Sequence, residues 1–150
     1  NGADAVAFYM SANAGEALKP LNKVASGGEL SRIMLAIKSI IADKDNVDTL
    51  IFDEIDTGIS GRAASKVAVQ LKKLSNVRQV ICVTHLAQIA AAAESHFLIE
   101  KSVDNGKTYT HVTLLNEEDR INEIARIMSG TNLSENIISS AKELIDRSKF

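Results

Sequence analysis

The 150-residue sequence predicts a single α/β domain over residues 1–150, with a mainly parallel sheet flanked by helices. Two short apolar runs are typical of strands buried on both faces of a parallel sheet: residues 49–54, which close in the carboxylates Asp53-Glu54, and residues 79–84. Segments with helical spacing lie before, between and after these runs, and the connections are short, which predicts right-handed crossovers. With 45% hydrophobic residues, the chain is long enough to bury a full core.

The composition argues against several broad classes of protein. A formal net charge of −2 does not suit a chain that binds nucleic acid mainly by neutralising phosphates. No stretch approaches about 18 uncharged apolar residues, and no basic region followed by an apolar one opens the sequence, so neither a membrane span nor a signal peptide is indicated. The single cysteine, Cys82, lies in an apolar run; we expect a small buried residue, as suits a reducing compartment, and not a nucleophile.

The predicted elements follow from periodicity and from turn residues. Residues 4–12 are interpreted as a strand. The first helix begins with Ser26 as its N-cap and runs to about Ala42, before a polar turn at 43–48. Its apolar residues recur at helical spacing and are expected to face a core: Leu30, Ile33, Met34, Ile37 and Ile41.

A second amphipathic helix is predicted after Ser60 and ends at Ser75-Asn76. Its apolar face consists of Ala64, Val67, Ala68, Leu71 and Leu74. An alanine-rich helix follows the second strand, from about Leu86 to Ala93.

The last third of the sequence predicts a β-hairpin and two helices. Strand-like runs at 96–101 and 108–114 flank Asn105-Gly106, and an Asn-Gly pair in this setting is a strong hairpin signal. One helix stops at Gly130, which suits a position just after a helix, and the other starts near Ser134. Their apolar residues in register are Ile121, Ile124, Ala125 and Met128, then Ile137, Ile138, Ala141, Leu144 and Ile145.

The stretch Ser26-Gly27-Gly28-Glu29 combines a helix start with an unusual pair of glycines. Ser26 suits the N-cap, and Glu29 completes a capping box in which each residue satisfies a backbone amide of the other. Glycine in a helix costs about 1 kcal/mol relative to alanine, so two glycines in the first turn need a physical reason. They either ease a tight entry into the helix or allow an anion, typically phosphate, to approach bare amides closely.

Polar side chains follow both predicted parallel strands, Asp53-Glu54 after the first and His85 after the second. Ligands of parallel α/β sheets bind at the carboxyl ends of the strands. Asp53 can hold Mg²⁺ there, and Glu54 can orient or deprotonate an attacking water. Because adjacent strand residues point to opposite sides, the two acids are not expected to do the same job. The alternatives are acids that only mark a strand end and a histidine without a ligand; no Cys/His cluster indicates zinc.

In combination these motifs resemble the C-terminal portion of the ATP-binding-cassette (ABC) ATPase fold, a P-loop NTPase-like head. Ser26-Gly27-Gly28-Glu29 matches the signature motif of that family, and residues 50–54 match its Walker B strand. Residues 56–60 match the D-loop and His85 matches the switch histidine. The resemblance thus implies a C-terminal lobe with a mainly parallel sheet flanked by helices, followed by the hairpin and C-terminal helices.

Glu29 and Ile55 narrow the resemblance, because transport ATPases usually carry Gln and Pro at these positions. Residues 25–36, 52–61 and 83–90 are similar to the RecN family of bacterial DNA repair proteins, which are SMC-like ABC-type ATPases. The likeness extends from about Asp4 to the last helix, so it covers nearly the whole chain.

The phosphate-binding loop Gly-x-x-x-x-Gly-Lys-[Ser/Thr], or Walker A motif, is missing from this sequence. In the family that loop lies in the N-terminal part of the polypeptide, separated by a long antiparallel coiled coil. The resemblance therefore implies that residues 1–150 are the C-terminal lobe of a split head, inactive as an ATPase alone. A first residue that is Asn1 and not Met agrees with our expectation of a longer protein.

The resemblance implies an ATPase acting in DNA double-strand break repair and recombination through ATP-dependent head dimerisation. The implied cofactors are ATP and Mg²⁺, with Asp53 serving the metal, Glu54 acting on the attacking water and His85 contacting the γ-phosphate. The stretch Ser26-Gly27-Gly28-Glu29 would close on the nucleotide of the opposite subunit, and Asp56 with its loop would run along the dimer seam. The implied partners are the N-terminal half of the same polypeptide, a second copy of the head, and DNA through the full-length protein. No membrane is implied, and the expected location is the cytoplasm, at the nucleoid.

Two other functions remain as alternatives. A nucleotide-binding lobe of an ABC transporter would require a transmembrane partner, and Glu29 and Ile55 argue against it. A non-catalytic interaction module that has kept the fold is the second alternative. The intact set of Asp53, Glu54 and His85 argues against that module.

Overall fold

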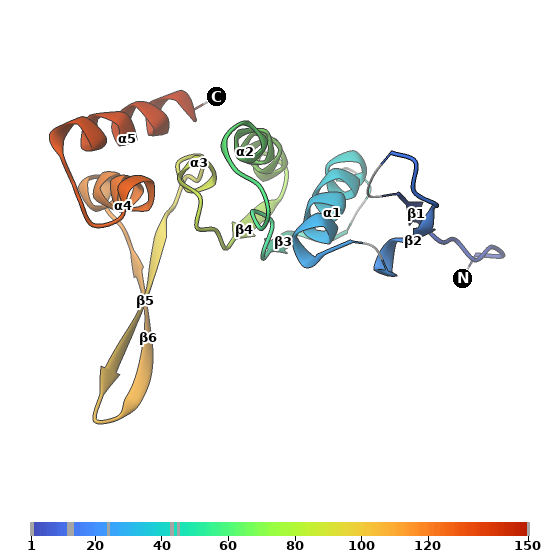
Figure 1. The fold of residues 1–150 in the computed structure, drawn as a ribbon, viewed down its shortest axis with the longest axis horizontal. Coiled ribbons are helices and arrows are strands. Elements are labelled where there is room, and N and C mark those ends of the chain that lie inside the picture. The colour runs from blue at the N-terminus through green and yellow to red at the C-terminus, as the bar shows by residue number, and fades with distance from the viewer. Residues whose placement is uncertain (1, 12–13, 24, 43, 45, 150) are drawn as a thin grey trace.

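The computed structural model describes residues 2–11, 14–23, 25–42, 44 and 46–149. The elements in chain order are β1 (Tyr9–Met10), β2 (Lys19–Pro20), the 3-10 helix η1 (Leu21–Lys23), α1 (Gly27–Ile41), β3 (Thr49–Phe52), α2 (Gly61–Ser75), β4 (Gln79–Cys82), α3 (Ala87–Ala90), β5 (Phe97–Asp104), β6 (Lys107–Leu114), α4 (Glu117–Ser129) and α5 (Glu135–Arg147). Figure 1 shows these elements spread along one long axis, with α1, β1 and β2 toward the end that holds the N-terminus and α4 and α5 at the opposite end.

The strand predicted at residues 4–12 was wrong over most of its length. Only β1 forms there, paired antiparallel with β2 through Tyr9↔Pro20 and Met10↔Lys19, and Ala12 lies outside the described residues. Val6 and Phe8 are exposed, because a two-residue pair offers no sheet face on which they can pack.

Helix α1 begins after Ser26 and forms the predicted capping box with Glu29. None of its predicted apolar residues is fully buried: Leu30, Ile33 and Ile37 are half-buried, and Met34 and Ile41 are exposed. The residue of α1 that enters the core is Leu35, which the prediction did not include. Because α1 packs mainly on α2, one side of its apolar stripe is not covered within the described residues. Of the polar turn predicted after it, Asp43 and Asp45 lie outside the described residues.

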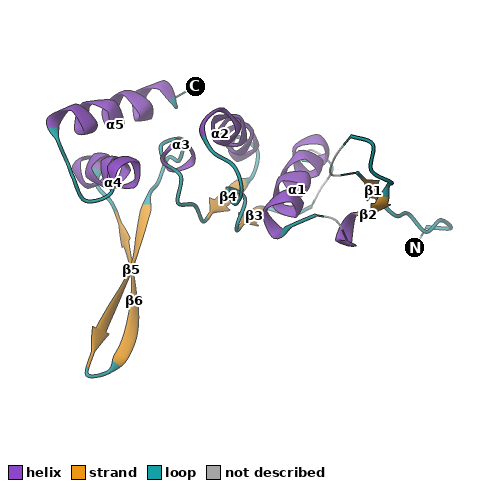
Figure 2. Cartoon of the chain, in the orientation of Figure 1, coloured by secondary structure: helices purple, strands orange, loops and turns teal. Residues whose placement is uncertain are grey.

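Strands β3 and β4 pair in parallel, from Thr49↔Gln79 to Phe52↔Cys82, with α2 between them in the chain. This confirms the predicted strand–helix–strand unit (Figure 2). The prediction that both faces are buried was wrong. Phe52 is 5% exposed beneath the helices, whereas Ile51, its neighbour on the other face, is 70% exposed. The apolar runs are therefore covered on one face only.

Helix α2 begins after Ser60 and ends before Asn76 as predicted, although the Ser60 side chain makes no capping hydrogen bond. Its predicted apolar face packs with α1, β3 and β4 in the first core cluster. That cluster contains Leu35, Ala42, Phe52, Ile55, Ala68, Leu71, Leu74 and Ile89. A second cluster joins α3 to α4 and α5, through Ala87, Ala90, Ala91, Ile124, Ala125, Ala141 and Ile145. Helix α3 is shorter than the helix predicted from Leu86 to Ala93.

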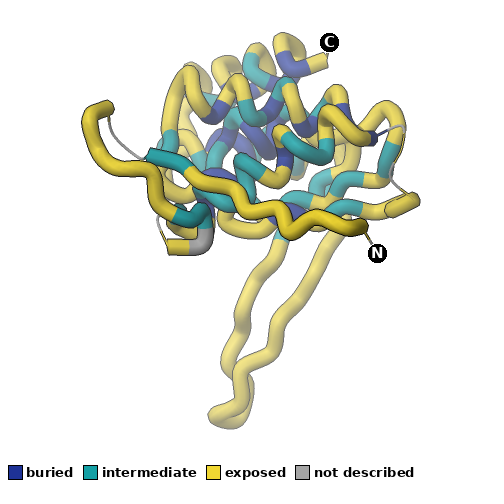
Figure 3. Tube along the Cα trace, turned by 90° about the vertical axis from the view of Figure 1, so that its right-hand side faces the viewer, coloured by how far each residue is buried: buried dark blue, intermediate teal, exposed yellow. Residues whose placement is uncertain are grey.

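The predicted hairpin is confirmed, as are the two helices that follow it. Asn105 and Gly106 both have positive φ, 49° and 74°, as a two-residue turn with this twist requires. The hairpin projects from the body of the molecule and is exposed along almost all of its length (Figure 3). Helix α4 ends at Gly130, whose φ of 75° confirms the predicted stop. Among the described residues, no helix has the length and apolar character that a membrane span needs.

Candidate nucleotide-binding site

The N-terminus of α1 is closed by its own capping box. The backbone N–H of Ser26 donates to Glu29 Oε2 at 2.8 Å, and the Ser26 hydroxyl donates to the same oxygen at 3.0 Å. The Glu29 N–H lies 3.4 Å from the Ser26 hydroxyl oxygen. These hydrogen bonds from Ser26 lower the pKa of Glu29. The Glu29 carboxylate is thus occupied with the helix start, whereas Ser26 and Gly27 lie on the surface.

Both glycines of this stretch meet the loop that follows β3. A Cβ on Gly28 would lie 2.9 Å from the carbonyl oxygens of both Glu54 and Thr57, and a Cβ on Gly27 would collide with the Glu54 carboxylate. The close approach that explains the two glycines is therefore made, in this structure, by the chain's own loop. The contact brings the predicted signature motif against the loop that follows β3, the strand predicted to be Walker B.

Two residues of α1 that the sequence did not single out tie the helix to this loop. The Ser31 hydroxyl donates to the carbonyl of Asp53 at 2.8 Å. Arg32 Nη1 donates to the carbonyls of Ile55 at 3.1 Å and Thr57 at 2.8 Å. Both side chains lie one turn into α1, on the side that faces the loop. The only signal for them in the sequence was their place within one turn of the glycine pair.

Asp53 and Glu54 are exposed just beyond the end of β3. Glu54 has a φ of 56°, in the left-handed region that costs a non-glycine residue on the order of 1 kcal/mol or more. Its N–H donates to Oδ1 of Asp53 at 2.8 Å, which supports this turn. Strand alternation predicts opposite directions for the two acids. Because β3 ends at Phe52, both acids lie beyond the strand, and alternation does not apply to them.

Asp56 is 3% exposed, and its carboxylate faces the end of β4. Its Oδ2 accepts hydrogen bonds from the Thr84 hydroxyl at 2.6 Å and from the His85 backbone N–H at 2.8 Å, and it lies 3.1 Å from His85 Nδ1. Burial acts to raise the pKa of Asp56, but the hydrogen bonds from Thr84 and His85 and the charge of the ring bring it below its ordinary value. The resemblance implied that Asp56 and its loop run along the dimer seam; in this structure the Asp56 carboxylate is buried against the end of β4.

The contacts join all four predicted motifs into one cluster. Gly27 touches Glu54, Glu54 leads through a buried Ile55 to Asp56, and Asp56 holds His85. The side chain of His85 is 72% exposed, so its ring is open to a ligand on the same side of the molecule.

The exposed acidic side chains after β3 suit a metal ion that takes most of its ligands from water and a substrate. Within the described part of the chain, no group of three or more His, Cys, Asp or Glu side chains is placed to hold an ion. A single exposed carboxylate such as Asp53 fits Mg²⁺, which keeps several waters and is usually bound by one or two carboxylates and the phosphates of a substrate.

Cys82 is half-buried at the end of β4. Burial, with the charges of Asp56 and Asp53, raises the pKa of its thiol to about 12. The thiol therefore stays protonated, which agrees with the sequence prediction of a packing residue and not a nucleophile.

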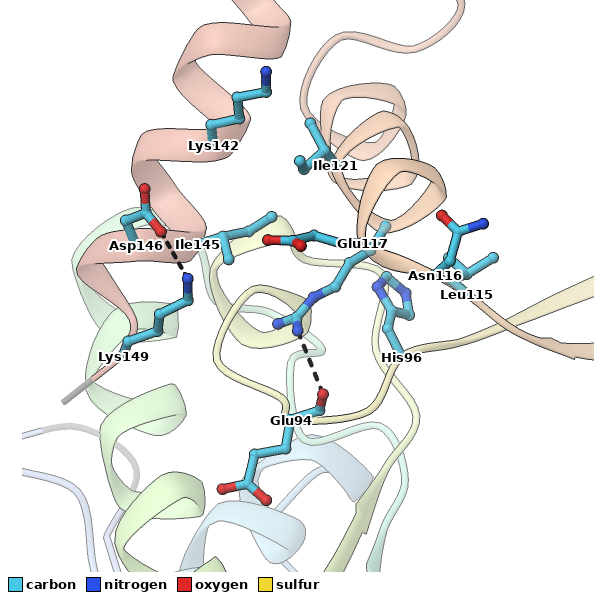
Figure 4. Close-up of a pocket in the computed structure, with 11 residues that line it drawn as sticks. Glu94, His96, Leu115, Asn116, Glu117, Ile121, Lys142, Ile145, Asp146 and Lys149 are labelled. Carbon is cyan, nitrogen blue, oxygen red and sulfur yellow. Dashed lines mark hydrogen bonds and ion pairs between the residues drawn. The ribbon is translucent and has the colours of Figure 1, made fainter.

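A pocket of about 510 Å³ lies elsewhere, between α4, α5 and the segment before β5 (Figure 4). Its lining mixes cations and anions: Glu94, Glu117, Arg120, Lys142, Asp146 and Lys149. Arg120 donates to the carbonyls of Ala91, Ala93 and Glu94, so it fastens this segment to α4. Burial and the charge of Arg120 lower the pKa of His96, which also lines the pocket. None of the predicted site residues lines this pocket, so the motif cluster is the stronger functional candidate.

Among proteins of known sequence, the chain is similar to DNA repair proteins named RecN. The chain is 48% identical over 146 residues to the DNA repair protein RecN of Halalkalibacterium halodurans, which covers 97% of this chain and 26% of that protein. It is 52% identical over 141 residues to RecN of Deinococcus radiodurans, covering 93% and 24%, and 48% identical over 144 residues to RecN of Bacillus subtilis, covering 96% and 25%. The chain thus spans about a quarter of the length of these relatives. No family model matches it.

One solved structure resembles this chain in its fold. It comes from a study of the structural biochemistry of ATP-driven dimerization and DNA-stimulated activation of SMC ATPases. That chain superposes with a TM-score of 0.52 at 22% identity, covering 79% of this chain and 71% of its own length. The protein therefore has the α/β fold of part of an SMC ATPase.

Proposed function

We propose that this chain, which is similar to a segment of RecN over nearly its whole length, is the C-terminal lobe of an ABC-type ATPase head. In the complete polypeptide the head binds and hydrolyses ATP and acts in DNA double-strand break repair and recombination, in the cytoplasm at the nucleoid. One observation carries the proposal: the chain of contacts from Gly27 through Glu54 and Asp56 to His85 gathers the motifs into one cluster. Since the similar proteins are DNA repair proteins, a transporter role has less support.

The residues of the cluster divide the work between binding and hydrolysis. Asp53 holds Mg²⁺, which, when bound, neutralises charge on phosphate oxygens. Glu54 orients or deprotonates the attacking water, and His85 contacts the terminal phosphate. The exposed positions of all three side chains support these roles.

The start of α1 serves the nucleotide of a second head. Amides at a helix N-terminus attract phosphate. The capping box uses the amides of Ser26 and Glu29, and Gly27 between them is exposed without a side chain. On the inner side the Glu54 carboxylate contacts Gly27 of its own chain.

The open face of the β3–β4 pair is the surface for the other lobe of the head, from the N-terminal half of the same polypeptide. Ile51, Ile81 and Val83 are 70%, 45% and 47% exposed there, although the opposite face is packed against helices. Apolar side chains gathered on one face of a sheet indicate a surface that is covered in the complete protein. The same lobe supplies the Walker A loop missing here. DNA binds through the full-length protein.

The substitution Glu54→Gln in the complete polypeptide tests the catalytic proposal. We expect phosphate release to fall to background, while ATP binding and ATP-dependent pairing of heads persist, because the amide keeps the size of the side chain and loses its basicity. Glu118→Gln, which changes an exposed carboxylate on α4, is the matched control and should turn over normally. Wild-type turnover of the Glu54→Gln protein would remove Glu54 from the hydrolytic role.

A second variant tests the role of the α1 start in pairing. Ser26→Arg in the complete polypeptide should spare ATP binding and block ATP-dependent pairing, as measured by light scattering with and without ATP. Ser139→Arg, at an exposed position of α5, is the control and should pair normally. Normal pairing of the Ser26→Arg protein would contradict the contact across the two heads.

A further inference from the structure

The buried carboxylate of Asp56 holds the ring of an exposed histidine. Its Oδ2 lies 3.1 Å from His85 Nδ1 and also accepts hydrogen bonds from the His85 backbone N–H and the Thr84 hydroxyl. Asp56 is 3% exposed, whereas the side chain of His85 is 72% exposed. The buried Asp56 carboxylate thus contacts the Nδ1 side of the His85 ring, while most of the His85 side chain is exposed.

This contact determines which nitrogen of His85 is available. An ionised carboxylate can only accept hydrogen bonds, so Nδ1 of His85 carries a proton wherever it bonds Asp56. The hydrogen bonds to Asp56 keep its pKa low, which leaves it ionised at neutral pH. Nε2 is then the nitrogen that remains for a ligand. In the imidazolium form both ring nitrogens carry a proton, and Nε2 can donate to a phosphate oxygen.

We propose that Asp56 is the positioning residue for His85, and that through this contact the site distinguishes a nucleoside triphosphate from a diphosphate. The inference rests on the proposed function and deepens it. Asp56 does not touch the nucleotide; it orients the imidazole so that Nε2 faces the place of the terminal phosphate. The diphosphate lacks that phosphate, so the contact contributes only to triphosphate binding.

The local geometry separates this role from a purely structural one. The bonds from the Thr84 hydroxyl and the His85 N–H are sufficient to fix the loop after β4 to the loop after β3. The ring contact adds little to packing, because most of the His85 side chain is exposed. The main effect of the contact between Asp56 and the His85 ring is to set the direction in which the ring points.

The test compares equilibrium binding of Mg²⁺ with ADP and with a non-hydrolysable ATP analogue, by calorimetry on the complete polypeptide. Asp56→Asn should reduce the preference for the triphosphate about tenfold and leave ADP affinity unchanged, because only the charge-assisted contact to the terminal phosphate is lost. Thr84→Val is the matched control: it loses one hydrogen bond to the same oxygen but keeps the ring contact, so the preference should persist.

A double-mutant cycle with His85→Ala shows whether the two residues act as one unit. His85→Ala should lower the triphosphate preference at least as much as Asp56→Asn, and adding Asp56→Asn to it should change the preference less than about twofold. If Asp56→Asn weakens ADP and triphosphate binding equally, or adds fully to His85→Ala, the positioning role is overturned. If His85→Ala itself leaves the preference intact, the proposed phosphate contact of His85 fails instead.

Discussion

The β3–β4 pair and the β5–β6 hairpin are both two-stranded sheets, yet they are stabilised in different ways. The parallel pair packs one face on α1 and α2, where Phe52 is 5% exposed. The hairpin has eight residues in each strand and is exposed on both faces along almost all of its length. The parallel pair depends on long-range burial, whereas the hairpin depends on its turn and its cross-strand pairs.

The apolar residues of the two sheets show what this difference means. On one face of the hairpin, Phe97 lies opposite Leu114 and Ile99 opposite Val112, and all four are exposed. Such pairs contribute only about 0.2–1 kcal/mol each, and an isolated hairpin is marginally stable. The open face of β3–β4, in contrast, is the reverse side of a packed core. The loop that carries Asp53 and Glu54 follows directly from this core, so the candidate site belongs to the better stabilised region.

The largest expected effect separates the two faces of β3. Phe52→Ala should lower the free energy of unfolding of this chain by about 3–5 kcal/mol, because it leaves a cavity in the core. Ile51→Ala, on the exposed face, should change it by less than about 0.5 kcal/mol. Urea denaturation measures both.

The same two variants in the complete polypeptide test whether the open face of β3–β4 is covered there. If the other lobe covers the open face, the cost of Ile51→Ala rises to about 2–5 kcal/mol and approaches that of Phe52→Ala. A cost that stays near zero in the complete protein would contradict the proposal that this face is an internal surface of the head.

The next effect concerns the link between α1 and the loop after β3, which has no counterpart in the hairpin. Gly28→Ala should destabilise the chain by about 1–3 kcal/mol, because the new Cβ meets two backbone carbonyls that cannot move independently. Gly27→Ala is the control: its Cβ meets only the flexible end of Glu54, so this change should be close to neutral. Equal costs of the two changes in thermal unfolding would show that the loop does not pack on Gly28 as described.

Acid should weaken the parallel-pair region through Asp56. The folded-state pKa of Asp56 lies below its ordinary value of 3.8, so its contribution is complete above that pH and is lost as the pH falls through the folded value. Asp56→Asn should cost about 1–2 kcal/mol at neutral pH, and this difference from the wild type should shrink well below pH 3.8. Urea unfolding at both pH values tests it; a constant difference would mean that the carboxylate charge does not contribute.

Local patterns predicted much of this molecule from the sequence. The capping box at Ser26, the turn at Asn105-Gly106 and the stop at Gly130 depend on neighbouring residues, and all three formed as predicted. The apolar runs also located β3 and β4 and the edge at which Glu54 and His85 lie, although the strands end at Phe52 and Cys82, before the ends of the predicted runs.

What the sequence could not show depends on distant parts of the chain. An apolar run indicates a strand but not how many of its faces are covered by helices, so it did not reveal that Ile51 is exposed. The burial of Asp56 depends on its hydrogen bonds to Thr84 and His85, almost thirty residues later in the chain, and composition does not indicate them. The hydrogen bonds of Arg32 depend on where α1 meets a loop more than twenty residues later in the chain.

The smallest expected effect concerns the hairpin and tests whether it is stabilised independently of the core. Gly106 has a φ of 74°, so Gly106→Ala places a Cβ in a strained conformation and should cost about 1 kcal/mol. Because the hairpin packs little on the rest of the molecule, hydrogen exchange should accelerate for the amides of β5 and β6 and stay unchanged for those of β3 and β4. Lys107→Ala, beside the turn, is the control and should leave both sets unchanged. If the β3 and β4 amides also exchanged faster, the two sheets would be one cooperative unit and the comparison would not hold.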